Sequence, residues 1–214
     1  MIIETRAVPP FEKNGYVVAC ETTRQAVVID PGDEVDMLLA IVKAQSLTVQ
    51  SILLTHAHVD HVTGVRRAKQ ALQVPVYLHR DDQFLYDAAS QQAAYFGLHC
   101  DVLPPIDHYY DLSSTLPFGE YEAGVHHTPG HCPGGVCLAI GRKGSKKEEL
   151  FVGDTLFAGS IGRTDLPGGD HATLIRSITQ VLFAFGDEAR VYSGHGPQTT
   201  IGEERRTNPF LRAM

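Results

Sequence analysis

The join between a short apolar run and a cluster of metal-binding side chains is the strongest constraint on the fold. Residues 51–54 read Ser-Ile-Leu-Leu, and residues 55–61 read Thr-His-Ala-His-Val-Asp-His. A short apolar run that ends at polar residues is typical of a buried strand, so the cluster is expected where a strand ends and a loop begins. Histidine is neither a strong turn former nor a core residue, so packing does not explain the cluster. Imidazole and carboxylate donors together predict a site for zinc, iron or manganese.

Three further segments repeat this placement of a polar residue just after an apolar run and beside glycine. They are residues 127–134 with His131, residues 151–155 with Asp154, and residues 191–197 with His195. Glycine at such points lets the backbone turn sharply and approach a ligand closely. Taken singly, each has an ordinary explanation as a turn, a cap or an incidental histidine. Taken together with residues 56–61, the four sites provide enough ligands for two metal ions. The candidate ligands are His56, His58, Asp60, His61, His131, Asp154 and His195.

Length and patterning predict one α/β domain over residues 1–214. The hydrophobic content of 43% and the charged content of 20% are ordinary for a soluble globular protein, and the length suffices for one large core. Short apolar runs predict strands at 26–29, 51–54, 74–78, 121–127, 135–140, 149–152 and 190–193. Apolar residues at helical spacing predict helices at 35–44, 62–72, 80–96 and 171–185.

Charge and the start of the chain limit the partners and the location. The formal charge of −7 argues against a nucleic-acid or anionic-membrane partner, since both need basic patches. No run reaches the roughly 18 apolar residues of a membrane span, and residues 1–6 do not resemble a signal peptide. A cytoplasmic location with reduced thiols is therefore expected. Cys132 directly follows His131, and a thiolate ligand there stays open.

In these motifs the sequence closely resembles the metallo-β-lactamase superfamily, and within it the glyoxalase II-like (hydroxyacylglutathione hydrolase-like) enzymes. The resemblance extends from about Gly15 to Pro209 and includes the cluster at 55–61, His131, the segment 153–157 and Gly194-His195-Gly196. It implies an αββα sandwich, in which two mixed β-sheets pack face to face with helices on the outer faces. The tail at 203–210 resembles the shorter bacterial branch, which lacks the glutathione-binding helical domain.

The resemblance also implies how the ligands divide between two metal ions. His56, His58 and His131 would hold the first ion, and Asp60, His61 and His195 would hold the second. Asp154 would bridge both ions, which are expected to be zinc, with iron or manganese as alternatives. A hydroxide shared by the ions would attack a thioester such as S-lactoylglutathione, while Asp60 and Asp154 orient the metals and the hydroxide.

Arg163 is the candidate substrate-binding residue. It lies nine residues after Asp154 in the segment 162–169, where glyoxalase II enzymes carry a basic residue that contacts glutathione. A guanidinium group near a metal cleft can bind a carboxylate through paired hydrogen bonds. A structural ion pair with Asp165 or Asp170 is the alternative interpretation.

Other activities of the same fold are alternatives. Persulfide dioxygenases share a similar Gly-Arg-Thr-Asp segment and bind one iron, for which the ligands here would be His56, His131 and Asp154. The turn at 194–197 favours the hydrolases instead. A metal-stabilised binding protein without catalysis agrees less well with a complete ligand set. β-Lactamases are usually exported, and nucleases usually carry added domains and a nucleic-acid-binding surface that this acidic chain lacks, so both activities agree less well with the sequence. The oligomeric state stays open.

Overall fold

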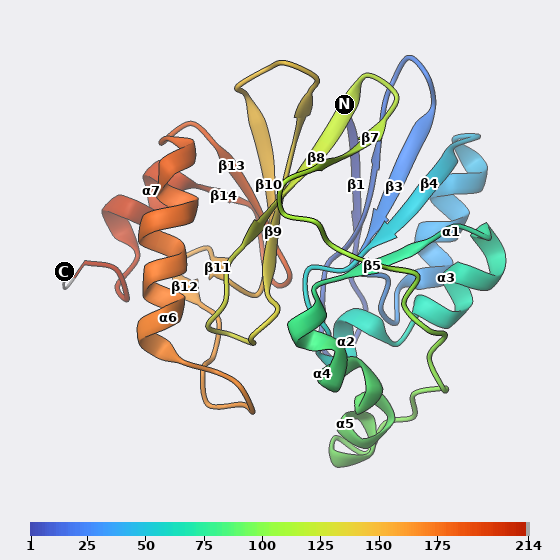
Figure 1. Ribbon diagram of the computed structural model, residues 1–214, viewed down its shortest axis with the longest axis horizontal. Helices are drawn as coiled ribbons and strands as arrows, with labels where there is room; N and C mark the ends of the chain where they lie inside the picture. The colour runs from blue at the N-terminus through green and yellow to red at the C-terminus, as the bar shows by residue number, and fades with distance from the viewer. Residues whose placement is uncertain (213–214) are drawn as a thin grey trace. The chain divides into compact units, whose positions relative to one another are not determined.

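Two six-stranded mixed sheets, each accompanied by helices, make up the fold (Figure 1). The structure is a computed structural model and describes residues 1–212. It divides into two units, one formed by residues 1–110 and 117–120 and the other by residues 111–116 and 121 onward. The predicted α/β class with two mixed sheets is confirmed.

The first sheet directs the ends of three parallel strands to one edge. Its strands, in spatial order, are β1 (Ile2–Arg6), β2 (Gly15–Ala19), β3 (Gln25–Ile29), β4 (Thr48–Leu53), β5 (Val76–Leu78) and β6 (His108–Tyr109). Strands β1 to β3 are antiparallel, whereas β3 to β6 run parallel. The segments that follow β3, β4 and β5 therefore begin at the same edge of the sheet.

Helices of the first unit pack on this sheet and on each other. They are α1 (Val35–Ala44), α2 (Val59–Val62), α3 (Val65–Leu72), the short helix η1 (Arg80–Asp82), α4 (Gln83–Asp87) and α5 (Ala89–Tyr95). Helix α1 contacts α3 and β2, and α3 contacts β4 (Figure 1). The prediction of one helix over 62–72 is wrong at its start, because the helix is interrupted at Gly64 and α3 begins only at Val65. The Gly64 amide donates to the Pro31 carbonyl (3.0 Å), and a Cβ there would lie 2.2 Å from the Gly32 oxygen.

The second sheet brings three of the predicted ligand loops to one edge. Its strands, in spatial order, are β14 (Thr199–Thr200), β13 (Arg190–Ser193), β10 (Glu148–Gly153), β9 (Val136–Arg142), β8 (Tyr121–His127) and β7 (Thr115–Phe118). Strand β9 is antiparallel to both β8 and β10, and β13 is parallel to β10. Strands β8, β10 and β13 thus point in the same direction, and the segments carrying His131, Asp154 and His195 leave the same edge.

A small hairpin and the C-terminal helices complete the second unit. The hairpin is β11 (Leu156–Phe157) with β12 (Ser160–Ile161), and the helical segments are α6 (His171–Arg176), η2 (Ser177–Val181), η3 (Leu182–Phe185) and α7 (Ile201–Thr207). The predicted helix at 171–185 is confirmed as an uninterrupted helical path, although its hydrogen-bond spacing widens in η2 and tightens in η3. Leu174, Ile178 and Leu182 recur at helical spacing and are fully buried against residues of β9 and β10.

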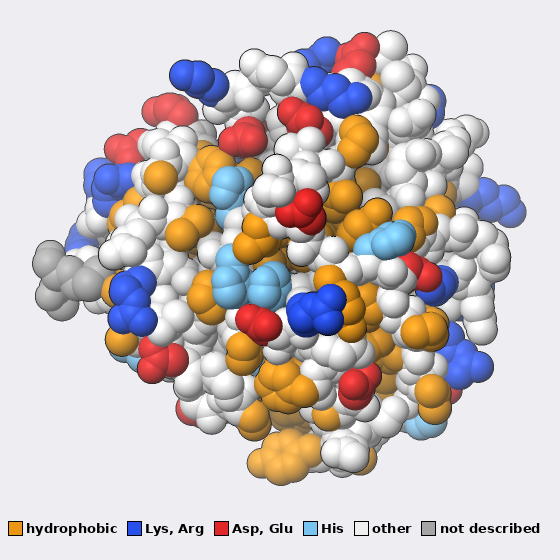
Figure 2. Space-filling view, in the orientation of Figure 1, with side chains coloured by type: hydrophobic (Ala, Val, Ile, Leu, Met, Phe, Trp, Pro, Cys, Tyr) orange, Lys and Arg blue, Asp and Glu red, His pale blue; other side chains and the backbone are white. Residues whose placement is uncertain are grey.

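Three general properties of the described residues concern membrane spans, cysteines and surface charge. Over residues 1–212, no helix is both long and apolar enough to cross a membrane. All four cysteines are buried thiols. On the face drawn in Figure 2, acidic and basic side chains are interspersed.

Candidate metal centre

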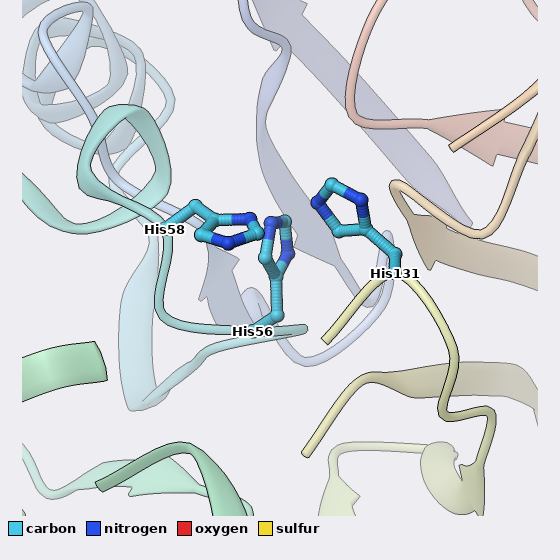
Figure 3. A group of neighbouring side chains, drawn as sticks. All are labelled: His56, His58 and His131. Atoms are coloured by element: carbon cyan, nitrogen blue, oxygen red, sulfur yellow. The ribbon is translucent and has the colours of Figure 1, made fainter. Parts of the chain in front are cut away.

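The loop after β4 and the short helix α2 hold four of the predicted ligands in the first unit. Figure 3 shows His56 and His58 on this loop, and Asp60 and His61 belong to α2. The three histidines are at most 8% exposed. The His56 ring centroid lies 4.9 Å from that of His58 and 4.0 Å from that of His61. Buried imidazoles this close are unusual as core residues and are typical of a metal site.

Hydrogen bonds at Nδ1 determine which nitrogen of His56 and His61 can bind a metal. The Asp30 carboxylate accepts from His61 Nδ1 at 2.9 Å. The Thr55 hydroxyl donates to the same carboxylate, so it accepts from His56 Nδ1 (3.2 Å). Both rings therefore carry their proton on Nδ1 and present the lone pair of a buried Nε2 atom. This orientation is the one that metal-binding histidines adopt when a carboxylate supports them.

Asp30 is a further candidate site residue, and it was not predicted from the sequence. It lies close enough to His56 and His61 to be counted as a ligand, since one donor atom of each residue falls within 4.8 Å. Its oxygens, however, accept from the Thr55 amide (2.7 Å), the Thr55 hydroxyl and His61 Nδ1. Asp30 therefore supports ligands rather than binding metal. The signal was present, because Asp30 follows the apolar strand β3 and precedes Pro-Gly, as the other strand-end sites lie beside glycine.

A buried ion pair holds Asp30 in place. Lys13 Nζ donates to the Asp30 carbonyl oxygen and to Glu34 Oε1, the latter at 2.6 Å. Glu34 Oε1 also accepts from the Gly32 amide (2.9 Å). Lys13 and Glu34 are 2% and 1% exposed, and a buried charge is tolerated when it is paired and hydrogen-bonded. The pair rigidifies the turn from which the Asp30 carboxylate reaches the histidines.

In the second unit, Asp154 lies between two of the predicted histidine ligands. Its Oδ2 atom is 3.6 Å from His131 Nε2 and 3.6 Å from His195 Nε2. Two ligand atoms that are each about 2.1 Å from one tetrahedral ion lie about 3.4 Å apart. The Asp60 Oδ2 to His61 Nε2 distance in the first unit, 3.7 Å, is of the same size. These separations, and the nitrogen and oxygen donor set, fit a transition-metal or zinc site.

Residue Arg163 supports His131 through its backbone. Figure 3 shows His131 on the loop that follows β8. Its Nδ1 atom donates to the Arg163 carbonyl oxygen at 2.8 Å, which again leaves Nε2 as the metal-binding nitrogen. The preceding Gly162 passes so close to Asp154 that a Cβ would lie 1.8 Å from the Asp154 carbonyl oxygen. Only glycine fits there, so the segment carrying Arg163 is held against the ligand loop.

The Arg163 side chain forms an ion pair with Asp165, which was the alternative interpretation of this residue. Its Nε and Nη2 atoms donate to the two Asp165 carboxylate oxygens at 2.7 and 2.8 Å. Hydrogen bonding to this guanidinium lowers the pKa of Asp165 to about 2. Both side chains are more than half exposed, so the pair is open to competition from a ligand carboxylate.

Comparison with known proteins identifies the family. The model of the metallo-beta-lactamase superfamily matches residues 8–195. The chain belongs to this superfamily. The matched range extends from before the Asp30 turn to His195 and so includes every predicted ligand. Full-length similarity to a named hydrolase and to a probable metallo-hydrolase, together with the buried histidines, identifies the chain as a metallo-hydrolase of the metallo-β-lactamase fold.

Three similar proteins illustrate the range of this superfamily. Hydroxyacylglutathione hydrolase GloC of Haemophilus influenzae is 37% identical, with 100% of this chain and 99% of the relative covered. A crystal structure of TTHA1623 in a di-iron-bound form is 42% identical, with 99% and 100% covered and a TM-score of 0.85. A crystal structure of BLEG-1 B3 metallo-beta-lactamase is 37% identical, with 98% and 99% covered and a TM-score of 0.88.

Proposed function

We propose that this metallo-hydrolase cleaves thioesters of the hydroxyacylglutathione type, with S-lactoylglutathione as the model substrate. The position of Asp154 carries the proposal, because one carboxylate oxygen lies 3.6 Å from the Nε2 atoms of both His131 and His195. A carboxylate in this position can bind two ions at once, as a dinuclear hydrolase requires. The identity to GloC over the full length supports the choice of substrate.

The seven predicted ligands would divide into two sets that share Asp154. As the resemblance to the family implies, His56, His58 and His131 would hold the first ion. By the same resemblance, Asp60, His61 and His195 would hold the second ion. We propose zinc as the metal, and iron is a second candidate because the similar TTHA1623 is described in a di-iron-bound form.

Bound metals would lower the pKa of water to near neutrality and polarise the thioester carbonyl. The chain's own residues then have separate tasks. Asp154 and Asp60 would orient the reacting groups through their carboxylates, and Asp30 would keep the proton of His61 on Nδ1. Arg163 would bind a substrate carboxylate after exchanging its partner Asp165, which the exposure of that pair permits.

The proposal is tested by elemental analysis of the purified protein together with a thioester-cleavage assay on S-lactoylglutathione. Metal-dependent cleavage that stops on chelation and returns with added zinc is expected. Oxygen uptake with glutathione persulfide and no thioester cleavage would favour the single-iron dioxygenase alternative. Hydrolysis of a β-lactam without thioester cleavage would assign the site to the chemistry of the BLEG-1 relative.

A further inference from the structure

The loop that carries His56 and His58 is held at every second backbone amide by a side chain from a different part of the first unit. The Thr55 amide donates to Asp30 Oδ1 at 2.7 Å. The Ala57 amide donates to Asp82 Oδ2 at 3.0 Å. The Val59 amide donates to Gln92 Oε1 at 3.2 Å. Asp30 follows β3, Asp82 is the last residue of η1 and Gln92 lies in α5, so three separate segments converge on the five consecutive residues 55–59.

The alternation has a simple geometric consequence. His58, the residue just before α2, has extended backbone angles (φ −67°, ψ 150°). The bonded amides at 55, 57 and 59 flank His56 and His58, so each histidine lies between two anchored peptide groups. A loop without these anchors would have backbone freedom that metal binding would have to remove.

The anchors Asp82 and Gln92 are built into the unit and are not incidental surface contacts. Asp82 is fully buried, and a buried carboxylate is costly unless it accepts hydrogen bonds. Gln92 is oriented by its own amide group, which donates to the Leu85 carbonyl oxygen at 2.8 Å and directs Oε1 at the loop. The Gln92 side chain thereby connects both α4, which contains Leu85, and α5 to the ligand loop.

We propose that Asp82 and Gln92 are positioning residues for the metal ligands His56 and His58, acting through the amides of Ala57 and Val59. The inference rests on the proposed metal site but not on its substrate. Loss of either anchor should weaken metal binding about ten- to a hundred-fold, as loss of supporting groups around metal ligands does.

Zinc titration of the metal-free protein against a competing chelator measures this effect. Asp82→Ala and Gln92→Ala should bind zinc more weakly, and their cobalt-substituted forms should show altered visible absorption. Asp82→Asn keeps an acceptor oxygen and should bind nearly as tightly as the wild type. If Asp82→Ala does not fold, Gln92→Ala carries the test, and wild-type zinc affinity in that variant would overturn the inference.

Ser90→Ala is the matched control, because Ser90 lies on the same helix as Gln92 and donates to the Cys100 carbonyl oxygen (3.1 Å) instead of the loop. It should keep wild-type zinc affinity and cobalt spectrum. Wild-type affinity in both alanine variants would overturn the inference, and so would an equal loss in Ser90→Ala. A wild-type protein that binds two ions but cleaves no thioester would count against the proposed substrate alone, since the titration uses no substrate.

Discussion

The backbone carbonyl oxygen of Arg163 accepts a hydrogen bond from His131 Nδ1 at 2.8 Å, while the Arg163 guanidinium pairs with Asp165. One residue thus takes part in two separate interactions. The backbone interaction orients a proposed metal ligand, and it survives any substitution that keeps the backbone in place. The side-chain interaction is exposed and is available to a substrate.

Arg163→Ala should therefore affect substrate binding without affecting the metals. We expect the KM for S-lactoylglutathione to rise about ten- to a hundred-fold with kcat nearly unchanged, since the lost contact is present in ground and transition states alike. Arg163→Lys should recover only part, because an ammonium group lacks the planar fork. Steady-state kinetics with a small neutral thioester are the control. Equal losses on both substrates would make Arg163 a structural residue.

Asp165→Asn should have the opposite effect on KM. It removes the carboxylate that competes for Arg163, so the KM for S-lactoylglutathione should fall about two- to five-fold, the range expected of an exposed pair. The pKa of Asp165 is lowered to about 2, so its charge is lost only as pH falls from about 4 toward 2. The ratio of variant to wild-type KM should then be constant from about pH 5 to about pH 8. An unchanged KM at all these pH values would contradict competition.

How much the sequence could predict depends on how local each interaction is. The seven candidate ligands could be proposed from the sequence because each lies shortly after an apolar strand, and within each sheet the parallel strands direct such positions to one edge. Asp82 and Gln92 act through hydrogen bonds to residues 25 and 33 positions away, and the periodicity of the sequence contains no trace of such bonds. The helix break at Gly64 was missed for the same reason, since its cause is the distant Pro31 carbonyl.

Gly162→Ala should displace Asp154 even though it changes no ligand. Its Cβ would lie 1.8 Å from the Asp154 carbonyl oxygen, so the backbone must shift. We expect a loss of about 1–3 kcal/mol in unfolding free energy, typical of overpacking, together with weaker metal binding. Gly124→Ala is the control, because its Cβ would make only ordinary contacts of 3.5 Å and more. Calorimetry and metal analysis measure these effects. Equal unfolding free energies and equal metal contents in the two variants would refute this expectation.

His58→Ala should remove most activity and lower the metal content while leaving the protein folded, because the core of the first unit does not depend on this side chain. His99→Ala is the control, since His99 is 85% exposed and matches no ligand position. Elemental analysis and circular dichroism on both variants test the assignment. Unchanged metal content and turnover in His58→Ala would remove this residue from the ligand set.

The central claim is that Asp154 binds two ions at once, and the metal content of wild type and Asp154→Asn tests it most directly. A neutral amide neither offsets the metal charge nor bridges well, so thioester cleavage should fall at least about a hundred-fold. Elemental analysis should give two metal equivalents per wild-type chain and clearly fewer in Asp154→Asn. Two equivalents and near-normal turnover in Asp154→Asn would contradict the bridging role and the dinuclear account built on it.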